Sequence, residues 1–205
     1  MNVKKLCIPL ILAVVLLAVP HRANAVTMFT ATLTGSQEFP PNLSTASGFA
    51  TFVLNDAMTA LTFSATIFGL DFTGSQTPNP PNPLDDLIAA HIHAPAPPGV
   101  NAGVVFGFFG LPFNDDNPND VVFTPFAIGV GGSISSKWDL PEGNSTTLAA
   151  QLPNILAGNS YINFHTVQFP GGEIRGQINQ VPEPASLILI GAGLAGLVAW
   201  RRIKR

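Results

Sequence analysis

Three histidines are the residues best suited to chemistry in this sequence. His91 and His93 stand two positions apart in one apolar stretch, and His165 lies in a second such stretch far downstream. Side chains alternate between the two faces of a strand, so the spacing predicts that His91 and His93 share one face while Ile92 takes the other. Imidazole nitrogens suit zinc or copper, and two on one strand plus one on a neighbouring strand form a workable ligand set.

The same histidines also have a structural interpretation. Histidines on paired strands can hydrogen-bond to the backbone or to a carboxylate and so lock sheets or loops together. The two alternatives differ in geometry. A metal site needs the three rings to converge within about 5 Å, because Zn–N bonds are about 2.0–2.1 Å long. Rings that point to separate backbone partners indicate the structural role. The sequence leaves both open.

A second feature is the acidic and basic pair that follows the Pro-Gly-Gly turn at 170–172. Glu173 and Arg175 are two positions apart and are predicted to share one strand face. Arg175 is the only arginine between residues 26 and 180, so we expect its charge to be paired, with Glu173 or with another acid. A structural ion pair of Glu173 and Arg175 would fix register more than it would add stability. An arginine that anchors a ligand is the functional alternative.

A third group of polar residues supplies oxygen atoms for calcium. It comprises the run Asn114-Asp115-Asp116-Asn117 with Asp120, and more weakly Asp85 and Asp86. The spacing is not that of an EF-hand loop, and the glycine of such a loop is missing. The sequence therefore favours a solvated acidic loop here.

Several function classes are excluded or left without support. Residues 26–180 carry two basic side chains, Lys137 and Arg175, against eleven acidic ones, which argues against nucleic acid as a partner. The only cysteine is Cys7, near the N-terminus, so no thiol nucleophile is expected in the folded part. No nucleophile elbow, P-loop or dinucleotide fingerprint is present. We expect no catalytic residues and no enzyme activity.

The elements that must position the histidines are short strands. Alternating apolar and polar residues separated by Gly, Pro and Asn predict strands at 27–34, 49–54, 61–68, around His91, and at 104–109, 133–140, 161–166 and 173–179. Residues 121–128 are predicted to be a strand or an extended connection, and 148–156 a short helix. This pattern indicates an all-β domain over residues 26–180, with a Greek-key-like sandwich or barrel.

The N-terminal segment, residues 1–25, is predicted to be a signal peptide. Lys4 and Lys5 precede an apolar run from 6 to 19, and Ala23-Asn24-Ala25 follows as a small-residue cleavage pattern. Signal peptidase is therefore an expected partner during export.

The C-terminal segment, residues 181–205, has three parts. Pro182-Glu183-Pro184 is followed by an apolar run over 187–200, predicted to be a transmembrane helix, and by a basic cluster of Arg201, Arg202, Lys204 and Arg205. This order closely resembles the PEP-CTERM sorting signal of Gram-negative bacteria. The resemblance implies cleavage by the membrane protease exosortase. It also implies an inner-membrane-anchored precursor that is delivered to the cell surface or the extracellular matrix.

Four stretches of the folded part resemble the CHRD domain, which is named for chordin. They are Ala31–Glu38, Ala90–Ala96, Leu156–Thr166 and Pro170–Ile178. The resemblance implies a β-rich extracellular module and no known reaction. Residues 111–140 match poorly and are expected to be an enlarged insertion. A His-x-His strand in a β-sandwich is also similar to copper–zinc superoxide dismutase. A four-histidine copper site cannot be assembled here, because His91, His93 and His165 are the only histidines after residue 25.

Two hypotheses follow from the sequence. The first is an exported, non-enzymatic CHRD module that binds or structures an extracellular polymer or envelope component. The second is a zinc- or copper-binding protein that uses His91, His93 and His165, with superoxide-dismutase-like chemistry as its furthest extension. The convergence of the three rings distinguishes them.

Overall fold

The computed structural model describes residues 26–77 and 83–182, together with 190, 191, 193, 194, 196, 197, 200 and 201. The predicted signal peptide, the residues Glu183 and Pro184 of the sorting motif, and most of the basic cluster lie outside these residues. Within the described part, no helix combines the length and the hydrophobicity needed to cross a bilayer.

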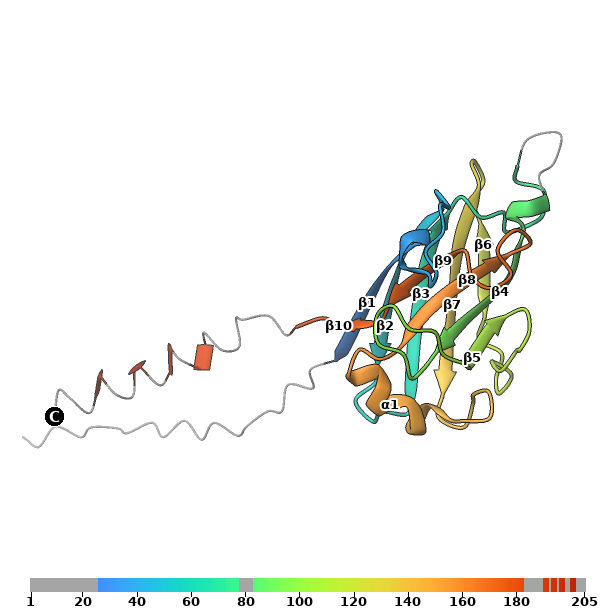
Figure 1. Cartoon of the computed structure of the whole chain (residues 1–205). Coiled ribbons are helices and arrows are strands. Elements are labelled where there is room, and N and C mark those ends of the chain that lie inside the picture. Colours follow the sequence, from blue (N-terminus) through green and yellow to red (C-terminus); the bar gives the residue numbers. More distant parts are fainter. Residues whose placement is uncertain are drawn as a thin grey trace, which may run out of the picture.

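The domain consists of ten strands in one antiparallel sheet (Figure 1). The hydrogen-bonded order is β5-β4-β8-β9-β1-β2-β3-β7-β6, and β10 pairs with β1. The strands are β1 (Thr27–Thr34), β2 (Ser47–Leu54), β3 (Ala60–Phe68), β4 (Leu87–His93), β5 (Val104–Phe109), β6 (Val122–Pro125), β7 (Gly131–Asp139), β8 (Tyr161–Thr166), β9 (Ile174–Gln177) and β10 (Asn179–Gln180). The 3-10 turns η1 (Gly35–Gln37) and η2 (Pro83–Asp85) and the helix α1 (Leu148–Leu156) complete the described elements.

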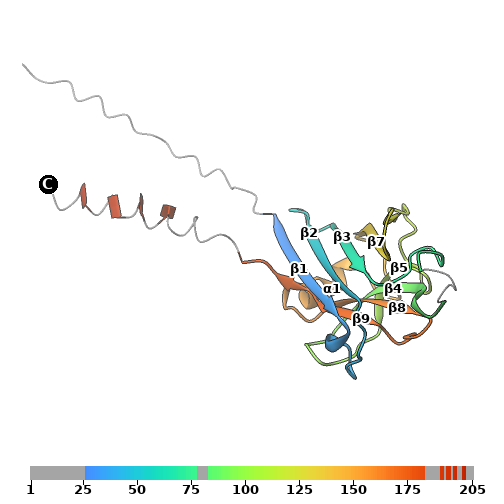
Figure 2. The ribbon, with the colours of Figure 1, turned by 90° about the horizontal axis from the view of Figure 1, so that it is seen from above.

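The sheet curls into a half-barrel (Figures 1 and 2). Strand twist accumulates across many strands, so the two ends of the sheet come to face each other. The rings of Phe109 on β5 and Phe123 on β6 stack with centroids 5.1 Å apart, although no described ladder joins these edge strands. The prediction of a mostly β fold is confirmed. Of the two expected architectures, sandwich or barrel, the structure is nearer to the barrel: one continuous sheet curls into a half-barrel, with the core inside the curl.

Aromatic side chains fill this core. Trp138 on β7 stacks on Phe106 of β5 with centroids 4.9 Å apart, and Phe63 of β3 meets Phe106 edge-on at 6.4 Å. These contacts join strands that are far apart in the order of the sheet, so they hold the curl closed. The indole N–H of Trp138 donates to the Glu142 carbonyl, so this buried polar group is satisfied.

The segment from 111 to 140, expected to be an insertion, contributes to the sheet itself. It supplies β6 and β7, and β7 pairs with β3 from Ala60↔Asp139 to Phe68↔Gly131. Because β7 also carries Trp138, this segment is part of the core. The helix α1 occupies the residues predicted for it and begins at Leu148, after the N-cap Thr147, whose hydroxyl accepts from the Ala150 N–H.

Strand β4 is buried on both faces, which is the feature that creates the site. Ala90 and Ile92 point into the aromatic core, while His91 and His93 point outward and are nevertheless buried. Loops that follow β4, β5 and β8 cover this outer face, because their carbonyl oxygens bond to the histidine rings. The polar side chains are therefore enclosed between the sheet and its loops.

The two faces of β2 provide a test of the core. Phe52 is fully buried and lies 5.5 Å from the ring of Phe63, whereas Phe49 on the opposite face is 48% exposed. We expect Phe52→Ala to lower the free energy of unfolding by about 3–5 kcal/mol, because it leaves a cavity. Phe49→Ala should cost less than about 1 kcal/mol. Urea titration of the full chain would measure both, and equal losses would contradict the inward-facing assignment.

Candidate metal centre

The outer face of β4, β8 and β9 carries polar residues in register. His91 is paired with Asn163, and Asn163 in turn with Arg175. The next row along the ladder pairs His93 with Tyr161 and Tyr161 with Gln177. His165 lies two residues beyond Asn163 on the same face, where it meets His91 diagonally. The alternation predicted for His91 and His93 is confirmed.

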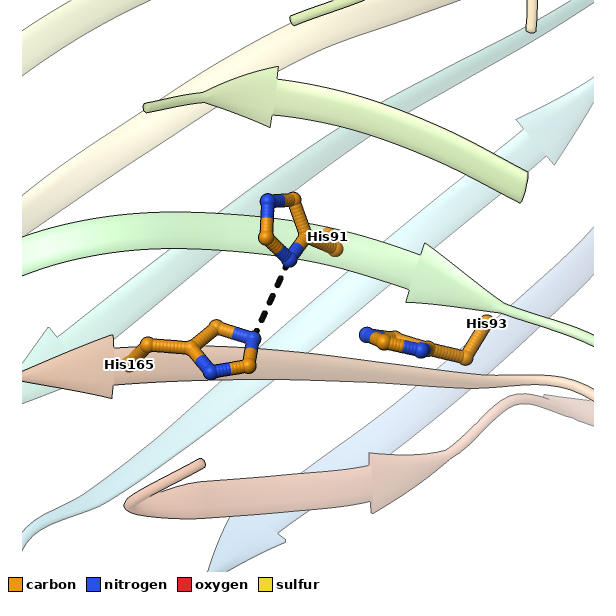
Figure 3. Close-up of side chains that lie close together, drawn as sticks. All are labelled: His91, His93 and His165. Atoms are coloured by element: carbon orange, nitrogen blue, oxygen red, sulfur yellow. Dashed lines mark hydrogen bonds between the residues drawn. The ribbon is translucent and has the colours of Figure 1, made fainter. Parts of the chain in front are cut away.

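The three imidazole rings converge on one point (Figure 3). One nitrogen from each of His91, His93 and His165 lies within 4.8 Å of the others. The closest approach is 3.1 Å, between His91 Nδ1 and His165 Nε2 (dashed line in Figure 3). All three side chains are buried. The geometry therefore meets the criterion for a metal site.

The opposite nitrogens of the same rings bond to backbone carbonyls. His91 Nε2 lies 3.0 Å from the Leu111 oxygen, His93 Nδ1 lies 2.9 Å from the Ala102 oxygen, and His165 Nδ1 lies 3.0 Å from the Pro170 oxygen. A carbonyl oxygen only accepts, so each of these nitrogens must carry the proton. A neutral imidazole has a single N–H, so the converging nitrogens must present lone pairs.

This tautomer assignment leaves the centre without a hydrogen-bond donor among the three rings. His91 Nδ1 and His165 Nε2 face each other as two acceptors, and His93 Nε2 is buried with no hydrogen-bond partner. Protonation would relieve the conflict, but burial opposes it. Burial lowers the pKa of His91 to about 3, with His165 and His93 adding to the effect. It also lowers the pKa of His165, and lowers that of His93 to about 4 although the bond to Ala102 opposes the shift. A cation would satisfy all three lone pairs.

Tyr161 and Arg175 form the wall beside His93. The Tyr161 ring stacks on His93 with a centroid distance of 4.7 Å and an interplanar angle of 3°. The Arg175 Cζ atom lies 3.4 Å from the Tyr161 ring centroid, a cation–π contact. Arg175 is 1% exposed, and its guanidinium donates to Asn101 Oδ1 at 3.3 Å and Gln177 Oε1 at 3.4 Å. The stack fixes the orientation of His93.

The ion pair expected between Glu173 and Arg175 is absent from the salt bridges of the described residues. Glu173 instead accepts from the hydroxyls of Ser44, at 2.6 Å, and Thr166. The reason is the spacing within a sheet. Residues i and i+2 of one strand are roughly 6.6 Å apart, whereas directly opposite residues of adjacent strands are about 4.5–5.5 Å apart. Cross-strand and loop partners are therefore nearer than the residue two positions along.

Glu38 is the acid whose charge acts on the pKa of Arg175. Its side chain is 7% exposed, and its Oε1 atom is buried without a hydrogen-bond partner. Burial raises the pKa of Glu38 to about 7, although attraction to Arg175 and the side chain of Asn163 act in the other direction. Asn163 thus lies between this carboxyl and the histidines.

The histidines open into a pocket of about 450 Å³. Its other lining residues offer no donor side chain; they are Ile88, Ala89, Val104, Gly110, Leu111 and Pro170. Gly110 has φ +67°, and a Cβ there would lie 2.1 Å from the Ile88 oxygen, so the rim of the pocket requires glycine at this position.

The acidic residues of the loop between β5 and β6 do not form a comparable cluster of ligands. Asp115 is fully buried and accepts from the Ser136 hydroxyl and the Asp120 N–H, so it does not face solvent with its neighbours. Asp120 pairs with Lys137 at 2.8 Å. Elsewhere in the described chain, carboxylate oxygens of Asp71, Asp85 and Asp86 gather within 4.8 Å, and Asp71 accepts from the backbone of Thr73, Gln76 and Thr77.

Sequence reasoning named the three histidines and missed the residues that orient them. Tyr161, Asn163 and His165 follow the same alternation as His91 and His93, so their common face could have been read from the sequence. The carbonyls of Ala102, Leu111 and Pro170 carry no such signal, because any residue type supplies a carbonyl oxygen.

Comparison with known families gives two matches. A model of the CHRD domain matches residues 29–178, and a model of the PEP-CTERM protein-sorting motif matches residues 180–205. A search of curated proteins finds no match, and neither does a search of solved structures. The first match covers all three histidines, and the second covers the C-terminal motif predicted to direct sorting.

The lowered pKa of His93 predicts that its contribution to stability depends on pH. Because its folded pKa is about 4 against 6.5 for the free side chain, the unfolded chain binds more protons between these values. The contribution of His93 to stability is therefore present above pH 6.5 and is lost as pH falls toward 4. The substitution His93→Asn keeps an N–H for the Ala102 carbonyl but cannot bind this proton.

We expect the free energy of unfolding of metal-free His93→Asn, relative to the unsubstituted chain, to rise by on the order of 3 kcal/mol from pH 7 to pH 4. Urea titrations at several pH values would measure this difference. A difference that does not vary with pH would contradict the buried neutral ring.

Glu38 provides a test of opposite sign. Its folded pKa of about 7 lies above the ordinary 4.5, so its stabilising contribution is complete below pH 4.5 and is lost as pH rises through 7. We expect Glu38→Gln to gain stability relative to the unsubstituted chain between pH 4.5 and 8, by on the order of 3 kcal/mol. Asp56→Asn, at an exposed turn, is the matched control and should show no such gain. Parallel pH dependence in both variants would refute the assignment.

Proposed function

The chain belongs to the CHRD domain family and carries a PEP-CTERM sorting motif, and on this basis we propose an exported, non-enzymatic module that binds a transition-metal ion at the cell surface or in the extracellular matrix. The sorting motif fits processing by exosortase during export. The metal-binding part of the proposal rests on one observation, the convergence of three imidazole lone pairs in a buried centre.

The distances support a bound ion. Two nitrogens that each lie 2.0–2.1 Å from a tetrahedral zinc ion are about 3.3 Å apart. The measured 3.1 Å between His91 Nδ1 and His165 Nε2 is close to that value. Small rotations of the rings suffice to bring the third nitrogen, within 4.8 Å, to the same ion. The carbonyl bonds on the opposite nitrogens are the partners that orient metal-binding histidines in general.

The structural role of the histidines is compatible with this proposal. Each ring has two nitrogens, and the one that holds a loop carbonyl is not the one that faces the centre. The two hypotheses drawn from the sequence therefore do not exclude each other. The same three side chains tie loops to the sheet and supply a ligand set.

The ligand chemistry defines the class of metal. Imidazole suits zinc and copper, whereas calcium and magnesium require oxygen ligands. We propose copper or zinc, with copper(II) bound more tightly, as the general order of divalent affinities requires. A superoxide-dismutase-like activity is not part of the proposal, because only three histidines follow residue 25 and no bridging ligand is available to them.

The test is metal binding by the full chain and by variants that preserve the loop contacts. His165→Asn and His93→Asn each keep an N–H at the Nδ1 position, for Pro170 and Ala102, and remove the converging nitrogen. His91→Gln does the same at the Nε2 position, for Leu111. We expect one zinc or copper ion per chain, and affinity at least about 100-fold weaker in each variant, by isothermal titration and elemental analysis.

The control is Asp86→Asn, which alters the other group of potential ligands and should leave zinc and copper binding unchanged. If the unsubstituted chain binds no zinc or copper, or if the histidine variants bind as well as it does, the proposal is wrong.

A further inference from the structure

The proposed ion would be held from one side only. The three histidines form one end of the 450 Å³ pocket, and none of the remaining lining side chains carries a nitrogen, oxygen or sulfur donor. Zinc sites with three protein ligands keep a fourth position for water or an exogenous group. The described residues therefore leave a coordination position that faces the pocket.

The charge of the ion determines which class of ligand its fourth coordination position would accept. Three neutral imidazoles leave the full charge of a divalent ion uncompensated. No carboxylate lines the pocket. Two acids outside the pocket lining have other partners: Glu173, just before β9, is bonded to Ser44 and Thr166, and the charge of Glu38, just after η1, interacts with Arg175. A buried divalent ion without a carboxylate in its environment favours an anionic ligand.

Asn163 is the competing occupant from this chain. Its Oδ1 atom is buried without a hydrogen-bond partner, and Asn163 is paired with His91 across the ladder. Asn163 does not line the pocket, however. Amide oxygens also suit magnesium and calcium better than zinc or copper.

We propose that the three-histidine centre, once it holds the transition-metal ion of the proposed function, binds a small monodentate inorganic anion at a fourth position open to this pocket. The inference rests on that proposed function. The apolar walls contributed by Ile88, Val104 and Leu111 supply no partners for a larger polar ligand.

The experiment is a titration of the copper(II)-loaded full chain with sodium azide, followed by the azide-to-copper charge-transfer absorption and by electron paramagnetic resonance. We expect saturable binding of one azide per copper. Val104 is paired with His93 in the β4–β5 ladder and lines the pocket, so Val104→Phe should fill the space in front of the ion. This variant should retain its copper and bind azide at least about tenfold more weakly, a loss of about 1.4 kcal/mol.

The matched control is Val122→Phe, the same change at an exposed position of the edge strand β6. It should bind copper and azide like the unsubstituted chain. Full copper loading without any azide response would show that the fourth position is filled by Asn163 or another donor, and would overturn this inference while leaving metal binding intact. Equal azide affinity in Val104→Phe would overturn the assignment to this pocket. Failure to bind either copper or zinc would overturn the proposed function and this inference together.

Discussion

The hydrogen bonds between three backbone carbonyls and three imidazole N–H groups determine the character of this site. A carbonyl oxygen can only accept, so the oxygens of Ala102, Leu111 and Pro170 fix the tautomer of each ring. Once these protons are assigned, the remaining nitrogen of each ring must carry a lone pair, and these lone pairs point toward one another. A contact that in isolation resembles a histidine–histidine hydrogen bond is then an approach of two lone pairs, which a bound cation would satisfy. The same bonds fasten three loops to the outer face of the sheet.

The curled sheet makes this arrangement possible. Its inner face is packed with aromatic rings, and contacts such as Trp138 on Phe106 hold the two ends of the sheet together. The outer face of β4, β8 and β9 therefore does not have to contribute to the core. It carries polar residues in register, and the loops that cover it bury most of the rings of His91 and His93. Burial lowers the pKa values of these rings and so keeps their lone pairs available.

Glu173 and Arg175 lie two positions apart in the sequence, yet they form no salt bridge among the described residues. Arg175 sits on the face of Tyr161, and the opposite face of that ring stacks on His93. Glu38 is near enough to feel the guanidinium, yet burial raises its pKa to about 7. Glu173 is satisfied by two hydroxyls. The polar face is thus organised by stacking and by hydrogen bonds, and no carboxylate lines the pocket into which the histidines open.

Local pattern determined much of this protein from the sequence alone. Alternation placed His91 and His93 on one face and located most of the strands, because side-chain direction in a strand depends only on position along the chain. The short helix α1 was also predicted from its own stretch of sequence. The order of motifs at the C-terminus identified the sorting signal, because that signal is linear. Tertiary structure decided the rest. Three features depend on which strands and loops become neighbours. They are the pairing of β4 with β8, the lack of a salt bridge between Glu173 and Arg175, and the three carbonyls that orient the rings. No single stretch encodes those neighbours, since they arise when the whole sheet curls around its aromatic core.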